Sequence, residues 1–535
     1  MRSLVTGAAG AAVVLAAATT VLTGGPALAG QSGGKHAVLL VCNGSTTPCP
    51  GTASPQYATV QAAVDAARPG DWILIWPGVY HENSPEWSSG VYVGTPRLHI
   101  RGLNRNKVII DGSNGTAAEP CPSSPALQGA PGRNGIDIGA SGVSVENLTV
   151  CDYLGDNGSG GNEIWWNGGD GSGKIGMGSY YGAYLTATAL FRPPYVAGSP
   201  NPDFAQYGIF VSNARGPGVI THSYASNMAD AAYYVGACRR VCNVVLSHDV
   251  GVNSALGYSG SNSGGRLVIK DSLFARNRAG IVPNSLNNDD APPPQDGRCQ
   301  HRRASCMIIE HNLIIGNDNP NVPLFGYMPA IGAGVEISGG MYDTVRDNVI
   351  KNDGSWGVIT HDYPDTEKPP PASHCQGGFP NVRFLGHKAC DFPARGNLVY
   401  GNTFVNDGFF GNATNGDMGT IGLVAKSPVP RNCFYANRAR LGGKPVALTS
   451  SPGHIERASV DGPSCGRRGT WSDAALYLQL ACASLGILCS AHAKYPQQTR
   501  LTVLPLPRLT TMPHPCAGVP ASGFCPARTG AVRSG

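Results

Sequence analysis

A 24-residue repeat in the middle of the sequence limits the folds open to this chain more than any other feature. Short β-rich blocks, YGIFV, AAYYV, ALGYS and AGIVP, begin at residues 207, 231, 255 and 279. A repeat of this length indicates one supersecondary unit stacked on copies of itself. At about 3.3 Å per strand residue, it fits one coil of three short strands and three turns. The repeat therefore predicts a parallel β-solenoid in which Gly208, Ala232, Leu256 and Gly280 form one vertical stack.

Polar residues recur at two further positions of the same repeat. The first set follows a β-rich run and is expected to form hydrogen-bonded ladders at an inward bend: Asn147, Ser223, Asp249, Ser272, Asn312, Asn348 and Asn402. The second set lies four residues further on: Asn227, Asn253, Asn352 and Asn406, with Asn277 and Asn317 one place later. Asparagine tolerates left-handed backbone, so this second set predicts turns.

The first 29 residues resemble a secretion signal. Arg2 gives the positive start, residues 4–22 are mainly small and apolar, and Ala27-Leu28-Ala29 fits a small-residue cleavage site. Residues 30–54 form a polar lead segment, and no later apolar run is long enough to span a bilayer. We therefore expect a secreted, extracellular protein without a membrane span.

All sixteen cysteines follow the predicted signal, and their even number suits an oxidising compartment. Nearest-neighbour spacing predicts eight local disulfides: Cys42–Cys49, Cys121–Cys151, Cys238–Cys242, Cys299–Cys306, Cys375–Cys390, Cys433–Cys465, Cys482–Cys489 and Cys516–Cys525. Spacing alone does not fix the connectivity, and the rival interpretation is a zinc site. Because no CxxC pair occurs, disulfides are favoured over a metal site.

The formal net charge of +5 is mild for 535 residues. A nucleic-acid-binding chain typically carries a pronounced basic excess. We expect no nucleic-acid partner, and the sequence does not reveal the oligomeric state.

The segment at residues 57–82 suggests how the solenoid begins. Thr59 is a plausible N-cap for a short amphipathic helix, Pro69-Gly70 ends that helix, and an apolar strand follows at 72–76. This segment resembles the start of right-handed parallel β-helix proteins of the pectin-lyase-like superfamily, and residues 97–112 resemble their first coils. The resemblance covers roughly residues 55–440.

The resemblance implies an all-β fold, a right-handed parallel β-helix with a short N-terminal helix cap. We expect residues 441–535 to form a disulfide-rich C-terminal cap and tail, with one helix over 472–485. This fold hosts lyases, hydrolases, esterases, epimerases and non-enzymatic proteins, so it does not settle the activity. Three insertions, at 152–205, 284–304 and 361–395, leave the regular coil, and such insertions often line a binding face.

The best catalytic candidates are His361, Asp362 and Asp365, which follow a predicted strand at the mouth of the longest insertion. Histidine acts as a base near neutral pH, and a neighbouring carboxylate can orient it or hold calcium. The competing interpretation is a solvated turn. His222, His248 and His311 also recur in one column, but other coils place Asp or Gly there, which indicates an exposed turn edge.

Aromatic residues are the candidates for substrate binding. Tyr233, Tyr234 and Tyr258, with Trp165, Trp166, Tyr180 and Tyr181 of the first insertion, could stack on sugar rings. They could equally stack on one another inside the coil. We expect Tyr233, Tyr234 or Tyr258 to line a cleft beside His361.

No cofactor is assigned by the sequence. Residues 168–174, GGDGSGK, fall one Asp short of a calcium-binding nonapeptide, so calcium stays a possibility. Two classes of function remain open. The first is a secreted polysaccharide lyase, epimerase or glycoside hydrolase. The second is a non-catalytic exported β-helix that binds polysaccharide or a cell surface.

Overall fold

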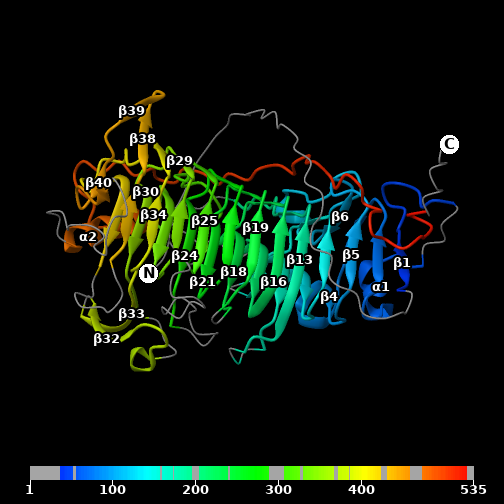
Figure 1. The fold of residues 1–535 in the computed structure, drawn as a ribbon. Coiled ribbons are helices and arrows are strands. Elements are labelled where there is room, and N and C mark those ends of the chain that lie inside the picture. The colour runs from blue at the N-terminus through cyan, green and yellow to red at the C-terminus, as the bar shows by residue number, and fades with distance from the viewer. Residues whose placement is uncertain are drawn as a thin grey trace, which may run out of the picture.

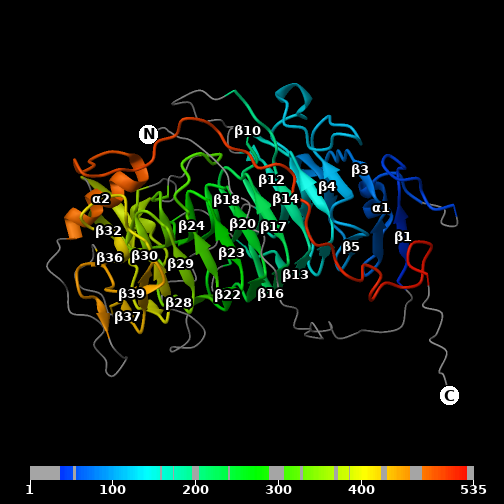
Figure 2. The same cartoon turned by 90° about the horizontal axis from the view of Figure 1, so that it is seen from above.

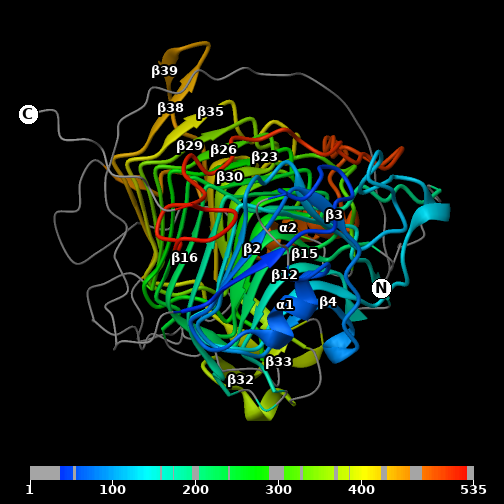
Figure 3. The same ribbon diagram turned by 90° about the vertical axis from the view of Figure 1, so that its right-hand side faces the viewer.

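Three long sheets wind through the molecule as successive faces of one solenoid (Figure 1). The computed structural model describes residues 36–51, 56–156, 159–170, 172, 174–194, 204–238, 241–287, 306–325, 329–366, 371–384, 386–422, 431–457 and 473–526. The predicted signal peptide, residues 1–29, lies outside these residues and stays a prediction. Seen along the axis, strands of the three sheets enclose a continuous interior (Figure 3).

Within the described residues the sheets contain 13, 12 and 11 strands, and each complete coil contributes one strand to each of them. The 13-stranded sheet has β1 (Val38–Val41), β2 (Trp72–Ile75), β5 (His99–Gly102), β8 (Ser144–Glu146), β13 (Met177–Ala183), β16 (Ala214–Thr221), β19 (Val244–Ser247), β22 (Leu267–Lys270), β25 (Met307–Glu310), β28 (Thr344–Arg346), β34 (Leu398–Tyr400), β37 (Cys433–Tyr435) and β41 (Glu456–Arg457). The 12-stranded sheet has β3 (Gly78–Tyr80), β6 (Val108–Asp111), β9 (Thr149–Cys151), β14 (Thr186–Thr188), β17 (Tyr224–Ser226), β20 (Val250–Val252), β23 (Leu273–Ala275), β26 (Leu313–Ile315), β29 (Val349–Lys351), β35 (Thr403–Val405), β38 (Arg438–Leu441) and β39 (Lys444–Val446).

The 11-stranded sheet carries the candidate site. Its strands are β4 (Ser89–Val93), β7 (Asn134–Ile138), β12 (Asn162–Asn167), β15 (Tyr207–Ser212), β18 (Ala231–Gly236), β21 (Leu256–Ser261), β24 (Ala279–Asn284), β27 (Ala333–Ser338), β30 (Trp356–His361), β36 (Gly416–Ile421) and β40 (Ser450–Ser451). Except for β38 with β39, every strand pair within the three sheets is parallel. The chain is a right-handed parallel β-helix protein, as predicted.

Among the described residues, two small sheets and four short helical elements lie outside the regular coils. The insertions contribute β10 (Gly155–Asp156) with β11 (Ser159–Gly160), and the antiparallel set β31 (Tyr363–Asp365), β33 (His387–Phe392) and β32 (Phe379–Phe384). Single 3-10 turns lie at Glu86–Ser88, Pro125–Leu127 and Ala372–His374. The helix α1 (Val60–Ala66) has Thr59 as its N-cap and packs Val60 and Val64 on the core at the N-terminal end of the coil.

The predicted stack is confirmed for three coils and is wrong by one residue at Leu256. Tyr207 pairs with Ala231, Ala231 with Leu256, and Leu256 with Ala279. Leu256 therefore stands one place before the predicted position, and Gly257 takes that place. The cause is uneven coil length, because the segment that holds Cys238 and Cys242 is longer than its neighbours and a later turn is shorter.

The predicted polar ladder exists over seven coils. Each backbone N–H donates to the side chain one coil on, at 2.9–3.1 Å, through Ser223, Asp249, Ser272, Asn312, Asn348, Asn402 and Asn437. Asn147 is a correction, because its φ of 58° puts it at the left-handed turn position just before the ladder. His222, His248 and His311 share that turn position and are exposed, as predicted.

Six of the eight predicted disulfides are confirmed: Cys42–Cys49, Cys121–Cys151, Cys238–Cys242, Cys375–Cys390, Cys482–Cys489 and Cys516–Cys525. The remaining pairings depend on Cys299 and Cys465, which lie outside the described residues. A set of local disulfides is typical of a protein that folds in an oxidising compartment. No helix among the described ranges is both long enough and apolar enough to cross a membrane.

The C-terminal region extends the coil and then returns along it. Strand pairing continues past residue 440 to β41, and α2 (Asp473–Leu485) lies against the outer face of the 11-stranded sheet through Leu476, Leu480 and Ala483. Residues 499–526, called the strap, then run back over the 12-stranded sheet to the N-terminal coils (Figures 1 and 2). There, Phe524 packs against Trp76.

Candidate functional site

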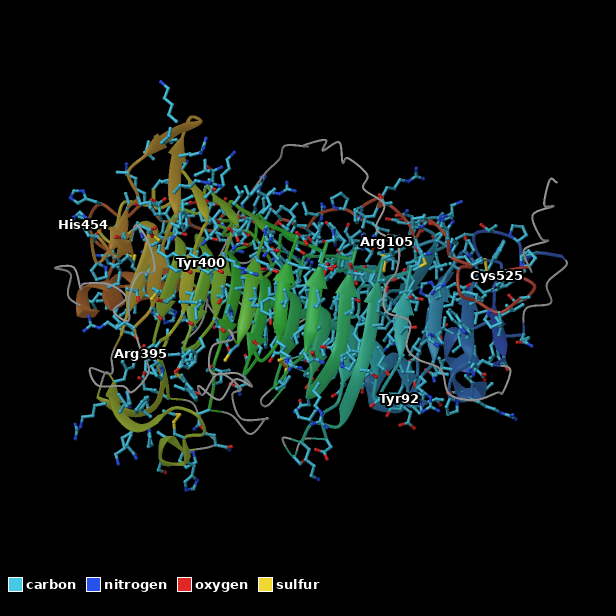
Figure 4. All side chains as sticks on the ribbon, in the orientation of Figure 1. Tyr92, Arg105, Arg395, Tyr400, His454 and Cys525 are labelled. Atoms are coloured by element: carbon cyan, nitrogen blue, oxygen red, sulfur yellow. A yellow bond between two sulfur atoms is a disulfide. The ribbon has the colours of Figure 1, made fainter. Side chains whose placement is uncertain are left out.

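Ionisable side chains gather at the carboxyl ends of two strands of the 11-stranded sheet and in the hairpin that follows them. We call this group the acid–base cluster: Glu336 of β27, His361 of β30, and Asp362, Asp391 and Arg395 of the third insertion. His361 ends β30, and the chain leaves the coil there to form β31, β32 and β33. Arg395 is labelled in Figure 4 beside this insertion.

His361 and Glu336 form a buried pair on the outer face of the sheet. His361 Nε2 lies 3.1 Å from Glu336 Oε1, and Nδ1 lies 3.0 Å from the carbonyl oxygen of Asp362. A carbonyl only accepts, so Nδ1 carries a proton, and Nε2 faces a carboxylate. Burial lowers the pKa of His361, but the hydrogen bond and charge of Glu336 outweigh it, and the pKa is raised.

This geometry makes His361 a cation that donates from both ring nitrogens. Because both ring nitrogens are engaged as donors, no lone pair is available to a substrate. The role of general base that the sequence suggested therefore does not suit His361 in this arrangement. The pair instead fixes the backbone of Asp362, whose carbonyl oxygen also accepts the Tyr477 hydroxyl of α2 at 2.7 Å.

Asp362 is fully buried, and its carboxylate points toward the hairpin. Oδ1 accepts the backbone N–H of Ala394 at 2.9 Å. A Cβ placed on Gly422 would lie 3.7 Å from Asp362 Oδ2 and 3.7 Å from Arg395 Nη2, so carboxylate and guanidinium approach the same point. The end of β30, the hairpin and the residue that follows β36 thus meet near Asp362.

Asp391 lies on β33, opposite Pro364 of β31, and is also fully buried. Neither of its carboxyl oxygens has a hydrogen-bond partner among the described residues. Burial and the negative charge of Asp362 raise the pKa of Asp391, Arg395 opposes the shift, and the resulting pKa is about 7. A carboxyl group poised near neutral pH beside a second carboxylate is the arrangement that acid–base catalysis uses.

Asp365 is held away from this group by a different contact. Its Oδ2 accepts the backbone N–H of Asn287 at 2.7 Å, and its backbone pairs with Cys390. These contacts tie the third insertion to the end of β24. The structure thus brings His361 and Asp362 together, and gives Asp365 a contact that organises the loops.

The three predicted tyrosines do not act as one surface. Tyr233 and Tyr258 point into the coil, are fully buried, and donate their hydroxyls to the carbonyl oxygens of Val250 and Val235. They cannot reach a ligand on the outer face. Tyr234 points outward, because side chains alternate along a strand.

Tyr234 belongs to a row of outward-facing aromatic rings. Trp165, Phe210 and Tyr234 occupy the same register position in β12, β15 and β18. Trp165 stacks on Phe210 with centroids 5.0 Å apart, and Phe210 meets Tyr234 edge-on at 4.7 Å. Tyr207 stacks on Phe210 at 4.5 Å and donates its hydroxyl to Asp230 at 2.8 Å. We call these four residues the aromatic row.

The described residues offer no clear metal site. The one group of three close ligand-type side chains among them is Asp111 with Cys121 and Cys151, and both sulfurs form a disulfide. In the stretch that resembles a calcium motif, Asp170 Oδ2 lies 3.8 Å from the ammonium nitrogen Nζ of Lys174, so this carboxylate faces a cation of the chain itself. Calcium binding stays an untested prediction.

A shallow hollow of about 340 Å³ lies elsewhere, at the exposed turns that hold His248, Asp271 and His311. It contains none of the residues of the acid–base cluster. Its walls are the left-handed turns and the first residues of β20, β23 and β26, so the hollow follows from the shape of the coil edge.

Sequence reasoning missed Glu336, Asp391, Arg395 and Tyr477. Glu336 carried the clearest signal, since it is the one charged residue in the apolar strand at 333–338. Asp391 follows Cys390, but nothing in the sequence indicates that the hairpin folds back on Asp362. Tyr477 depends on where α2 docks.

No protein-family model matches the chain. No curated protein matches it either. Among solved structures, the A-module of the Azotobacter vinelandii mannuronan C-5 epimerase AlgE4 is 13% identical, with a TM-score of 0.40, over 75% of this chain and 94% of that one.

Two other solved structures show similar coverage. A mannuronic acid-specific family 6 polysaccharide lyase from human gut microbiota is 17% identical, with a TM-score of 0.38, over 71% of this chain and 81% of that one. The catalytic domain of a GH87 α-1,3-glucanase is 9% identical, with a TM-score of 0.41, over 82% of this chain and 70% of that one. At these identities no residue role passes to this chain.

Proposed function

We propose that this protein is an exported enzyme that hydrolyses glycosidic bonds of a polysaccharide at the acid–base cluster. The observation that carries the proposal is Asp391, a fully buried carboxyl group without a hydrogen-bond partner among the described residues. Its pKa is raised to about 7, and a second carboxylate, Asp362, lies close enough to contribute to that shift. Burial of such a group costs stability, and catalysis is a reason to retain it.

Glycoside hydrolysis uses two carboxyl groups in different protonation states. In this assignment the β32–β33 hairpin moves aside to admit the substrate, because Asp391 and Asp362 are both fully buried in this structure. Asp391, protonated in part at neutral pH, then gives its proton to the glycosidic oxygen as the bond to the anomeric carbon breaks. Water adds to the anomeric carbon, and its proton passes to a carboxylate. Asp362, held by the Ala394 N–H, stabilises the positive charge that develops on the sugar ring.

Hydrolysis fits the cluster better than β-elimination. Elimination from a uronate needs a cation to neutralise the substrate carboxylate and a free base to remove a proton. Arg395 already faces Asp362 and Asp391, and His361 donates from both nitrogens. Neither cation is left for a substrate carboxylate.

The Glu336–His361 pair has a positioning role in this proposal. It holds the Asp362 carbonyl from one side, and the Tyr477 hydroxyl holds the same oxygen from the other. Both contacts hold the backbone of Asp362 in place and so position its carboxylate. Arg395 and Gly422 are half-buried and lie at the edge of the cluster.

Export is part of the proposal. It rests on the apolar, Ala-rich first 29 residues and on the disulfides, which persist in oxidising compartments. A polysaccharide outside the cell is the substrate that such a location supplies.

The second candidate is a non-catalytic protein that binds polysaccharide. The aromatic row favours it, because outward-facing rings on adjacent strands can stack on sugars without any chemistry. In that case the acid–base cluster has only a structural role.

Product analysis separates these functions. The mature chain, residues 30–535, is incubated at pH 5, 6 and 7 with neutral glucans and xylans and with alginate and polygalacturonate. Hydrolysis predicts new reducing ends without the ultraviolet absorbance of unsaturated uronates. Absorbing products would show elimination instead, and the absence of any product would favour the binding protein.

A further inference from the structure

The 11-stranded sheet contains no lysine and no arginine in any of its strands. Its charged residues are Asp137, Glu163, Glu336, Asp417 and His361, and His361 is paired with Glu336. The two other long sheets do carry cations, among them Lys270, Arg346 and Lys351. Asp137 and Glu336 lie on its outer face, whereas Glu163 and Asp417 share the register position of Ala232, which packs in the interior. The strands of this sheet therefore place no lysine or arginine on its outer face.

The aromatic row lies on this same face. Trp165, Phe210 and Tyr207 are half-buried, so part of each residue remains accessible, whereas Tyr234 is buried. The rings come from three adjacent strands, which lie about 4.8 Å apart. The row therefore extends along the solenoid axis over about 10 Å.

Polar groups border the rings. The Trp165 indole N–H donates to Ser212 Oγ at 2.9 Å, and the Tyr207 hydroxyl donates to Asp230. Asp137 occupies the register position next to Trp165 on β7, and burial raises its pKa to about 7, with the Asn167 amide partly offsetting burial. Burial also raises the pKa of Asp230, to about 6.

We infer that the aromatic row binds a neutral polysaccharide chain that lies along the solenoid axis, and that it rejects polyuronates. Aromatic faces stack on the apolar faces of sugar rings, and hydroxyl groups can donate to carboxyl and amide oxygens at the border. A polyuronate would place a carboxylate on every residue, close to the half-buried Asp230 and without any strand cation to meet it. This inference rests on the proposed function for its setting and names the substrate class.

Binding is measured with the mature chain by titration calorimetry against soluble β-glucan, α-glucan and xylan oligosaccharides and against mannuronate and galacturonate oligosaccharides. We expect at least one neutral series to bind, with an affinity that changes little between low and high salt. Trp165→Ala should weaken that affinity by about tenfold or more, and Trp165→Tyr should restore most of it. Thermal unfolding verifies that both variants fold.

The matched control is Tyr435→Ala. Tyr435 stacks on Tyr400 with centroids 4.7 Å apart, but on the 13-stranded sheet. Its replacement should leave glycan affinity unchanged.

The inference is overturned if only uronates bind, if no neutral series binds, or if Trp165→Ala and Tyr435→Ala behave alike. The outcomes that overturn this inference differ from those that overturn the proposed function. Hydrolysis of a uronate polymer would keep the enzyme class and remove the neutral substrate, whereas neutral binding without product would keep the aromatic row and remove the enzyme.

Discussion

Asn227 and Leu504 exchange two hydrogen bonds although 277 residues separate them in sequence. Asn227 Nδ2 donates to the Leu504 carbonyl at 3.0 Å, and the Leu504 N–H donates to Asn227 Oδ1 at 2.9 Å. Asn106 holds Leu509 through the same two-bond pattern, at 2.7 and 2.9 Å. The side-chain amides thus pair with the strap as a neighbouring strand would. The strap joins coils far apart along the solenoid.

Loss of the Asn227 contact should destabilise the protein. Asn227→Ala removes both hydrogen bonds to the strap, together with those to Thr188 and Asn253. It leaves the Leu504 backbone groups without these partners, which costs about 1–3 kcal/mol. Asn406→Ala is the control, because Asn406 has a similar left-handed φ of 59° but bonds Asn352 rather than the strap. Chemical denaturation should show the larger loss for Asn227→Ala. Equal losses would mean that the turn conformation alone matters.

Truncation after residue 498 should lower the midpoint of thermal unfolding by several degrees. It removes the contacts of Asn106 and Asn227 and the packing of Leu504 and Leu509 on the 12-stranded sheet. A synthetic peptide of residues 499–526 added in excess should recover part of the loss. An unchanged midpoint in the truncated chain would show that the strap contributes no stability.

Asp353→Asn should stabilise the protein at neutral pH. Asp353 is fully buried in a ladder where Asn277 and Asn317 hold the equivalent places, and it lies next to Asp407. Burial, with the charge of Asp407, raises its pKa well above the ordinary value. The folded state therefore favours the protonated form, so stability is highest below the ordinary carboxyl pKa and falls as pH rises through the raised pKa.

We expect Asp353→Asn to gain about 1–3 kcal/mol at pH 7 and much less near pH 3. Denaturant titrations at the two pH values measure the difference. A gain that is equal at both pH values would exclude ionisation of Asp353 as its cause.

Glu336→Gln should destabilise the fold and change the titration of His361. Removing one member of a buried ion pair costs about 3–5 kcal/mol. The raised pKa of His361 depends on Glu336, and burial alone lowers it. The variant should therefore move the His361 imidazole titration, followed by NMR, from above to below the ordinary histidine pKa. An unmoved titration would contradict the doubly donating geometry.

The repeat predicted the coil because three short strands and three turns set a nearly constant spacing. It failed at Leu256 because the segment around Cys238 and Cys242 and a later turn changed the coil length in opposite directions. Asn147 was placed one residue out for a similar reason, since periodicity alone cannot locate the left-handed residue of a turn.

The site was predicted only in part. A strand end followed by a long insertion pointed to His361 and Asp362, whereas Asp391 depends on how β33 folds back beside β31. Tyr233 and Tyr234 are adjacent in sequence but face opposite sides of the strand, so one belongs to the core and the other to the aromatic row. The composition of the strand could not show which tyrosine faces the interior and which faces outward.

The central claim is tested most directly by the turnover of Asp391→Asn on the polysaccharide that the wild-type chain cleaves. The control is Asp343→Asn. Asp343 is equally buried and also has a raised pKa, but it sits in a ladder that continues as Asn397 and Asn432. We predict that Asp391→Asn loses about 100-fold or more in kcat while its unfolding midpoint is unchanged or raised, and that Asp343→Asn keeps wild-type kcat. Equal turnover of wild-type and Asp391→Asn would contradict the proposed role of Asp391.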